Sequence, residues 1–286
     1  MGVAMKAGVV GAGLMGAEIA LVFALAGCDV VINDRDVGSL DRGIERIEAV
    51  LRKGVDQKRY APNQAEEAQA RIHPATGLAE FAECGVVTEA VFETIEVKTA
   101  VLQALDATCP ADCVIVSNTS TIPISTLAGA LPPARRSRFL GTHYFSPVSR
   151  MSLVEVVPGF ETENDVVGEV VALMRSLGKT PIVIKDVAGF AVNRMLHAMM
   201  IEAVRLVEEG VASPEDLDTA CRLGLGHPIG PFALMDVVSS GLCLQVQTIL
   251  QEAHGERFRP PALLKQRVAA GLGGGRGRRG WLNKAS

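Results

Sequence analysis

Positive charge and aromatic residues are both in short supply in this sequence. Its 28 Lys and Arg are outnumbered by 32 Asp and Glu, which gives a formal net charge of −4, and Phe, Trp and Tyr make up 4% of the 286 residues. A domain that binds the phosphate backbone of DNA or RNA needs a basic surface. The composition therefore argues against a nucleic acid partner.

Paired cysteines, long apolar runs and a leader pattern are missing as well. No stretch approaches the roughly twenty apolar residues of a membrane-spanning helix, and the start MGVAMKAGVV lacks the segments of a signal peptide. CPADC places two cysteines four residues apart with no second pair, which is weak for a zinc site. We expect no metal, no membrane association, a cytoplasmic location and reduced thiols at all six cysteines, which are at positions 28, 84, 109, 113, 221 and 243.

Apolar residues are plentiful, at 48% of the chain, and the length favours two domains. Over the first part, β-branched runs alternate with helical patterns, which predicts a parallel sheet covered by helices on both faces. The expected strands fall in 6–13, 28–34, 84–90, 112–118, 138–145 and 151–157, and the expected helices in 14–27, 40–60 and 95–108.

The pattern changes after PIVIKD, at residues 181–186. From Gly189 onward the sequence is typical of helices separated by Pro and Gly. We expect an α/β domain at 1–186 and a mostly α-helical domain at 187–286. The last segment, GLGGGRGRRGWLNKAS, has a composition typical of a disordered end.

The first expected strand runs into a glycine-rich loop that opens a helix. A lone G-x-G-x-x-G is weak evidence, but here an acid, Asp34, follows at the end of the second expected strand. This context predicts a Rossmann-type, doubly wound domain that binds a dinucleotide at the helix N-terminus. Asp34 would bind the adenosine ribose and repel a 2′-phosphate, which favours NAD, although Arg35 could bind that phosphate. The loop is Gly11, Ala12, Gly13, Leu14, Met15 and Gly16.

One histidine and one glutamate lie in two apolar runs separated by turn residues, in GTHYFSPVSRMSLVEVV. If these runs form a hairpin centred near Ser149, His143 and Glu155 face each other, with Cβ atoms about 5 Å apart. A carboxylate that orients an imidazole is the arrangement of a catalytic base. The alternative from these residues alone is a buried ion pair that only fixes the hairpin.

Several motifs, in order, resemble the 3-hydroxyacyl-CoA dehydrogenase family over nearly the whole chain. They are GAGLMG, TEAVFETIEVK, SNTSTIPI, GTHYFSPV with SLVEVV, DVAGFAVNRMLHAMMIEAVRLVEEG and GLGHPIGPFALMD. The resemblance implies NAD as cofactor, an acyl-CoA thioester as substrate and a homodimer formed by the helical domain.

The resemblance also implies roles for single residues. His143 matches the catalytic base and Glu155 its partner. Ser120 matches a serine that contacts the reacting oxygen, the cofactor and the substrate, and without the resemblance it would pass as a helix N-cap. Asn193 matches an asparagine that the helical domain adds to the site, where core hydrogen bonding is the alternative.

The remaining implied contacts concern the two ends of the ligands. Glu93 and Lys98 match residues at the nicotinamide-side ribose; from the sequence alone they pass as a solvated pair at a helix start. Ser146 stands where the family usually has an asparagine that reaches the cofactor, and Arg276 where it has a lysine in the tail. The CoA phosphates need cations, for which the expected helix offers Arg46, Arg52 and Lys53.

These observations predict NAD-dependent oxidation of an L-3-hydroxyacyl-CoA, such as 3-hydroxybutyryl-CoA, to the 3-ketoacyl-CoA, and the reverse reduction. Two alternatives stay open. The hydroxyacyl group could be carried by a carrier protein or be a free sugar-type hydroxy acid, or the chain could bind NAD(H) without turnover.

Overall fold

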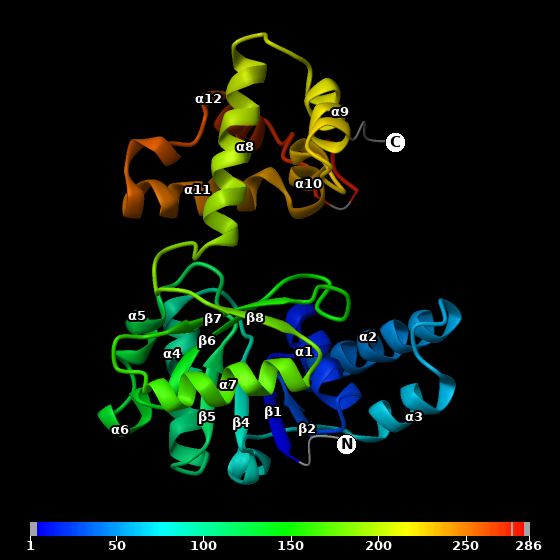
Figure 1. Cartoon of the computed structure of the whole chain (residues 1–286), viewed down its shortest axis with the longest axis vertical. Coiled ribbons are helices and arrows are strands. Elements are labelled where there is room, and N and C mark those ends of the chain that lie inside the picture. Colours follow the sequence, from blue (N-terminus) through cyan, green and yellow to red (C-terminus); the bar gives the residue numbers. More distant parts are fainter. Residues whose placement is uncertain (1–4, 276, 283–286) are drawn as a thin grey trace. The chain divides into compact units, whose positions relative to one another are not determined.

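The computed structural model describes residues 5–275 and 277–282. The chain divides into two compact units, Met1–Val187 and Ala188–Ser286. Each unit has a core of its own, and in Figure 1 the first contains the sheet and the second is made of helices.

The first unit is built on one sheet of eight strands, in the order β3-β2-β1-β4-β5-β6-β7-β8. All neighbouring strands pair in parallel except β6 and β7, which form an antiparallel hairpin. The strands are β1 (Lys6–Val10), β2 (Asp29–Asn33), β3 (Ile72–Ala75), β4 (Val86–Glu89), β5 (Val114–Ser117), β6 (Phe139–Tyr144), β7 (Leu153–Pro158) and β8 (Thr180–Val183).

Helices cover this sheet, as alternation of strand and helix predicts. Apart from Glu18, helix α1 is apolar around its whole circumference, and it is buried from Gly16 to Ala24, because the sheet lies on one side of it and α2 and α3 pack against it. Figure 1 shows α7 crossing in front of the strands. The helices are α1 (Leu14–Leu25), α2 (Val37–Asp56), α3 (Pro62–Ala70), α4 (Ile95–Thr108), α5 (Ile124–Ala128), α6 (Pro133–Arg136) and α7 (Asn164–Ser176), with a 3-10 turn η1 (Ala79–Glu83).

Several elements differ from those expected, and two of the differences have a clear local reason. The helix expected over 40–60 ends at Asp56, since Lys58 has a left-handed backbone with φ of 55°, which an α-helix does not allow. Strand β3 was missed because IHPA contains a proline and two exposed residues. It pairs only with β2, at the edge of the sheet where a proline is tolerated.

The second unit is helical, as expected. Its core joins α8, α10, α11 and α12 with the tail residue Trp281. The elements are α8 (Val192–Glu208), α9 (Pro214–Gly224), α10 (Pro231–Val238), α11 (Ser240–His254), a 3-10 turn η2 (Glu256–Phe258) and α12 (Ala262–Ala269).

All six cysteines are free thiols, and all but Cys221 are buried. Among residues 5–275 and 277–282, no single helix is long and apolar enough to cross a membrane; α10 and α11 meet that test of length and composition only together, as a pair bent by 102°. Within the same residues, no cluster of three or more His, Cys, Asp or Glu could hold a metal ion.

Candidate active site

The glycine loop joins β1 to α1 at the carboxyl end of the sheet. Gly11 has a φ of +102°, and a side chain there would also meet the Ala90 carbonyl oxygen, 2.5 Å from an added Cβ. At Gly16 an added Cβ would collide with the carbonyl of Gly11. Both positions therefore exclude every residue but glycine, and a tight turn alone is enough to explain these two glycines.

Gly13 needs a different explanation. It precedes α1 as the N-cap, has φ of −66°, and an added Cβ would have nothing within 4 Å. The space beside it is a cavity of about 640 Å³ that also borders β2, α2 and α4. A glycine at this place leaves the backbone open to a ligand, and the first N–H groups of α1 point toward it, as a pyrophosphate requires. The residues present therefore fit a dinucleotide.

Asp34 lines the same cavity directly after β2. Its Oδ2 accepts a hydrogen bond of 2.7 Å from the backbone N–H of Ala12, and its Oδ1 accepts one of 2.8 Å from the N–H of Arg35. The first bond ties the glycine loop to the end of β2. Each carboxylate oxygen can accept further bonds, so Asp34 can still bind ribose hydroxyls.

The β6–β7 hairpin places His143 opposite Glu155, which confirms the predicted register. The Nδ1 of His143 lies 2.7 Å from Oε2 of Glu155, and the two residues are 6% and 0% exposed. When Nδ1–H donates to the carboxylate, Nε2 is the basic nitrogen of the ring. The ring of Phe145 lies against the imidazole, with centroids 4.5 Å apart.

A neighbouring strand fixes the end of β6. The backbone N–H of Tyr144 donates to Oδ1 of Asn118, which follows β5. Asn118 was not among the predicted site residues, although it stands in the same SNTS motif as Ser120. Its position after a buried strand at the carboxyl edge of the sheet was the available signal.

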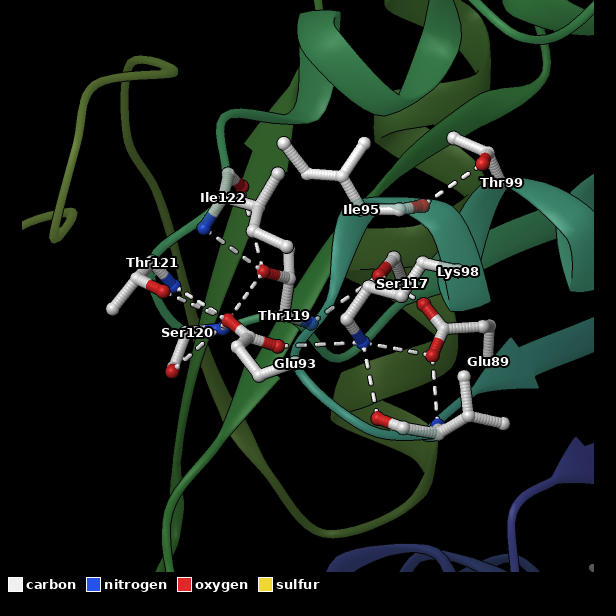
Figure 2. A network of polar contacts seen from close by, with 11 residues as sticks. Glu89, Glu93, Ile95, Lys98, Thr99, Ser117, Thr119, Ser120, Thr121 and Ile122 are labelled. Carbon is white, nitrogen blue, oxygen red and sulfur yellow. Dashed lines mark hydrogen bonds and ion pairs between the residues drawn. The ribbon is translucent and has the colours of Figure 1, made fainter. Parts of the chain in front are cut away.

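A polar network connects Ser120 to the start of α4 (Figure 2). Oε1 of Glu93 accepts hydrogen bonds from the backbone N–H groups of Ser120 and Thr121, at 2.8 and 2.9 Å. The hydroxyls of Thr119, Ser120 and Thr121 donate to the same oxygen, at 2.7, 3.2 and 3.0 Å. One carboxylate thus holds the whole turn that carries Ser120.

Ser120 is not a helix N-cap, because α5 begins at Ile124 with Pro123 before it, and Asp186 accepts the N–H groups of Ile124 and Ser125.

Lys98 is 1% exposed and lies between two carboxylates (Figure 2). Its Nζ is 2.8 Å from Oε1 of Glu89 and 3.4 Å from Oε2 of Glu93. Glu89 also accepts a bond of 2.6 Å from the hydroxyl of Ser117. The interpretation of Lys98 as part of a solvated pair at a helix start is therefore wrong. Glu89, the acid that ends the buried strand β4, was not among the predicted site residues.

Burial alone would raise the pKa of Glu93. The positive charge of Lys98 and the hydrogen bonds from Thr119, Ser120 and Thr121 outweigh it, so this pKa lies below its ordinary value. Glu93 is therefore ionised at neutral pH and acts only as a hydrogen-bond acceptor.

The other predicted site residues are distributed more widely. Ser146 is exposed in the loop after β6, and Asn193 is in the first turn of α8 in the second unit. On α2, Arg46 lines the cavity beside Gly13, while Arg52 and Lys53 are exposed and do not line it. Arg276 lies outside the described residues.

Comparison with known proteins supplies the family. The model of the 3-hydroxyacyl-CoA dehydrogenase NAD binding domain matches residues 6–187, and that of the C-terminal domain matches residues 189–284. The chain belongs to the 3-hydroxyacyl-CoA dehydrogenase family. It is an NAD-dependent dehydrogenase, and the predicted resemblance, fold class and cofactor are confirmed.

Individual members of the 3-hydroxyacyl-CoA dehydrogenase family are similar over almost their full length. A probable 3-hydroxybutyryl-CoA dehydrogenase of Deinococcus radiodurans is 40% identical over 269 residues, covering 94% of this chain and 96% of the relative. A 3-hydroxybutyryl-CoA dehydrogenase of Bradyrhizobium diazoefficiens is 37% identical over 279 residues, covering 97% and 94%. The crystal structure of (S)-3-hydroxybutyryl-CoA dehydrogenase from Ralstonia eutropha has a TM-score of 0.92 at 35% identity and covers 99% of this chain and 100% of its own.

Proposed function

We propose that this dehydrogenase oxidises short-chain L-3-hydroxyacyl-CoA thioesters, such as (S)-3-hydroxybutyryl-CoA, and catalyses the reverse reduction. The observation that carries the proposal is the 2.7 Å bond between His143 and the buried Glu155, in the same unit as a cavity that fits a dinucleotide. The names of the similar bacterial proteins support the short acyl chain.

His143 is the proposed base. Oxidation of a secondary alcohol removes a proton from oxygen and a hydride from carbon, and the bound nicotinamide supplies the hydride acceptor. Nε2 of His143 takes the proton, while Glu155 holds the tautomer that makes Nε2 basic and stabilises the imidazolium. Burial of both side chains strengthens this interaction, because little water screens it.

Ser120 and Asn193 are the proposed partners of the substrate oxygens, where charge develops during the reaction. The geometry of the first unit supports this for Ser120, because Glu93 fixes its turn through five hydrogen bonds. Glu93 and Lys98 are proposed to contact the nicotinamide-side ribose, and Glu89 holds the ammonium group of Lys98 in place.

We propose that exposed cationic side chains on α2 bind the phosphates of CoA. Arg52 and Lys53 remain candidates, whereas Arg46 faces the dinucleotide cavity. Lys53→Glu should raise KM for a CoA thioester and leave KM for a pantetheine thioester unchanged. Equal KM changes for both thioesters would contradict this contact.

A substrate panel tests the function. NADH absorbance would be followed with (S)- and (R)-3-hydroxybutyryl-CoA, a carrier-protein thioester and a free 3-hydroxy acid. We expect the highest kcat/KM for the (S)-CoA thioester. Higher kcat/KM for the carrier-bound or free acid would favour those alternatives, and NADH binding without turnover of any member would favour a non-catalytic protein.

We also propose a cytoplasmic homodimer. Free buried thiols are typical of a reducing compartment. Apolar side chains of the second unit are exposed around α9 and α10, including Leu223 at 82%, Leu225 at 65% and Val237 at 69%, which is typical of an interface. Sedimentation should give a mass near twice 30.2 kDa for the wild type and a smaller mass for Leu223→Glu. A monomeric wild type would contradict the dimer.

A further inference from the structure

The strands around His143 end at different points. The pairing of β5 with β6 stops at Ser117 and Gly141, whereas the pairing of β6 with β7 continues through His143 to Tyr144. The end of β6 that contains His143 therefore extends past β5 and is paired on the β7 side alone.

The side chain of Asn118 takes the place of the missing stretch of β5. Backbone groups that face the same neighbour recur every second residue along a strand. The carbonyl of Arg138, directly before β6, accepts from the N–H of Ile115 on β5. The even-numbered residues of this stretch thus face β5, and Tyr144 is one of them. A longer β5 would offer a carbonyl to the N–H of Tyr144, which donates instead to Oδ1 of Asn118 at 3.0 Å.

This hydrogen bond acts on the peptide group next to His143. The N–H of Tyr144 and the C=O of His143 belong to one planar peptide group, so the orientation of that group sets the ψ angle of His143. By the same alternation, His143 presents its own backbone groups to β7, where it is paired with Glu155. Asn118 therefore holds one edge of this peptide group, and β7 holds the other.

Asn118 is itself held in place. Its backbone N–H donates to the carbonyl of Glu89, at the end of β4, at 2.8 Å. Because the N–H of Tyr144 can only donate, the amide atom that it meets is the oxygen, and this fixes the orientation of the amide. Two residues later, Ser120 lies on the turn that Glu93 holds. Asn118 thus connects the end of β6 to the turn of Ser120.

We propose that Asn118 is a positioning residue for the dehydrogenase reaction, and that its Oδ1 sets the place of the His143 imidazole relative to the turn of Ser120. The inference rests on the proposed role of His143 as the base. A misplacement of about 1 Å can cost on the order of 10²-fold in rate. One hydrogen bond to the peptide group of His143 can therefore control turnover while the cofactor still binds.

Thr162 offers a matched control, because its side chain bonds to the other end of the same strand. Its hydroxyl donates to the carbonyl of Phe139, the first residue of β6, at 2.7 Å and accepts from the N–H of Gly159 at 2.9 Å. Thr162→Ala and Asn118→Ala each remove a side-chain bond to the backbone of β6, so both should lower the melting temperature. Only Asn118→Ala should lower kcat, by about tenfold or more, with KM for the thioester and affinity for NADH close to those of the wild type.

Asn118→Asp separates the two ends of the amide, because it keeps an acceptor in the same place and removes the N–H donors. It should recover most of the kcat that Asn118→Ala loses. The comparison is made at about pH 9, where the imidazole of His143 is neutral despite the added negative charge. Absence of recovery, or weaker NADH binding with kcat unchanged, would mean that Asn118 contacts a ligand, and would overturn the positioning role. Equal kcat for Asn118→Ala and Thr162→Ala would overturn it as well.

Proton NMR of the protein without substrate tests the geometry independently of turnover. The Nδ1 proton between His143 and Glu155 is expected far downfield and is identified by its loss in His143→Ala. This resonance should move in Asn118→Ala and stay in place in Thr162→Ala, and an unchanged resonance in Asn118→Ala would overturn the proposal. A wild type that turns over no thioester would contradict the proposed function, and the resonance would still decide whether Asn118 positions His143.

Discussion

His143 and Glu155 share a short hydrogen bond on a strand pair that is buried on both sides. At the scale of the residue, such a pair serves either catalysis or stability alone. The two cases differ in how the effects of substitutions combine, because groups that act as one catalytic unit are not additive.

The substitution Glu155→Gln keeps the shape of the side chain and removes the charge that stabilises the imidazolium. We expect His143→Ala to lower kcat on the order of 10²–10⁴-fold, Glu155→Gln to lower kcat as well, and the double variant to be little worse than His143→Ala. Steady-state rates on the best thioester, together with NADH affinity, provide the measurement. Losses that multiply independently, or full activity of Glu155→Gln, would show that the pair is only structural.

Glu93 is the second residue whose charge can be tested. Its pKa in the folded protein lies below the ordinary value, because Lys98 and the donors of the Ser120 turn outweigh the effect of burial. A depressed pKa means that Glu93 stabilises the fold above its unfolded pKa, near 4.5, and that this contribution is lost as the pH falls through the folded pKa.

We therefore predict that Glu93→Gln lowers the melting temperature at pH 7 and has a smaller effect at pH 3.5. Melting curves of both proteins between pH 3.5 and 7 check this, with Glu96→Gln as control, since Glu96 is an exposed acid in the first turn of the neighbouring α4. A difference between Glu93→Gln and wild type that is constant over this range would disprove the stabilising charge.

At the scale of the element, hydrogen bonds connect the loop between β6 and β7 to α1, the helix that begins beside the cofactor cavity. Glu18, buried on α1, accepts hydrogen bonds of 2.9 Å from both the backbone N–H and the hydroxyl of Ser149. Lys179, which precedes β8, donates to the carbonyls of Val148 and Met151. Burial lowers the pKa of Lys179, and the charge of Glu18 acts in the opposite direction. These contacts hold the loop that contains Ser146.

Glu18→Ala should thus destabilise the protein by about 2 kcal/mol, since two donors lose a charged acceptor. Ser149→Ala should be milder, because its backbone N–H still reaches Glu18. Urea unfolding is the measurement, and Glu45→Ala, an exposed position on α2, should change the free energy of unfolding by less than about 0.5 kcal/mol. If Glu18→Ala is as stable as Glu45→Ala, the loop does not depend on this contact.

At the scale of the whole molecule, Trp281 of the glycine-rich tail is part of the core of the second unit. The backbone N–H groups of Trp281 and Leu282 donate to the two carboxylate oxygens of Asp236, at 2.7 and 2.9 Å. The indole packs 4.9 Å from the ring of Phe232 and donates from Nε1 to Ser240, and Arg267 lies over it at 4.2 Å. The tail therefore closes the helical unit.

Trp281→Ala should lower the free energy of unfolding of this unit by about 3–5 kcal/mol, the range for a buried large aromatic. Trp281→Phe should cost less, because a ring still packs against Phe232. Trp281 is the only tryptophan of the chain, so its emission reports on the tail itself. Emission of the native wild type at the wavelength of a solvated indole would show that the tail is not docked.

Local and periodic features of the sequence predicted much of this molecule. The glycine loop with Asp34 indicated the cavity because the αL turn at Gly11 and the open backbone at Gly13 are properties of a few adjacent residues. The turn in GTHYFSPVSRMSLVEVV fixed which residues face each other, so His143 opposite Glu155 followed from counting. The alternation of strand and helix patterns in the sequence likewise predicted the parallel sheet.

Only the tertiary structure decided features that depend on residues far apart in the chain. The turn of Ser120 is held by Glu93, 27 residues before it, and Trp281 is docked because Asp236, 45 residues before it, accepts its backbone N–H. Arg46 and Arg52 look alike in the sequence, yet only Arg46 borders the cavity. Helix α2 packs against the loop at Ala12 in one orientation, which places the face with Arg46 toward the cavity. Spacing along the chain specifies which side chains share a face, and packing between elements determines what that face meets.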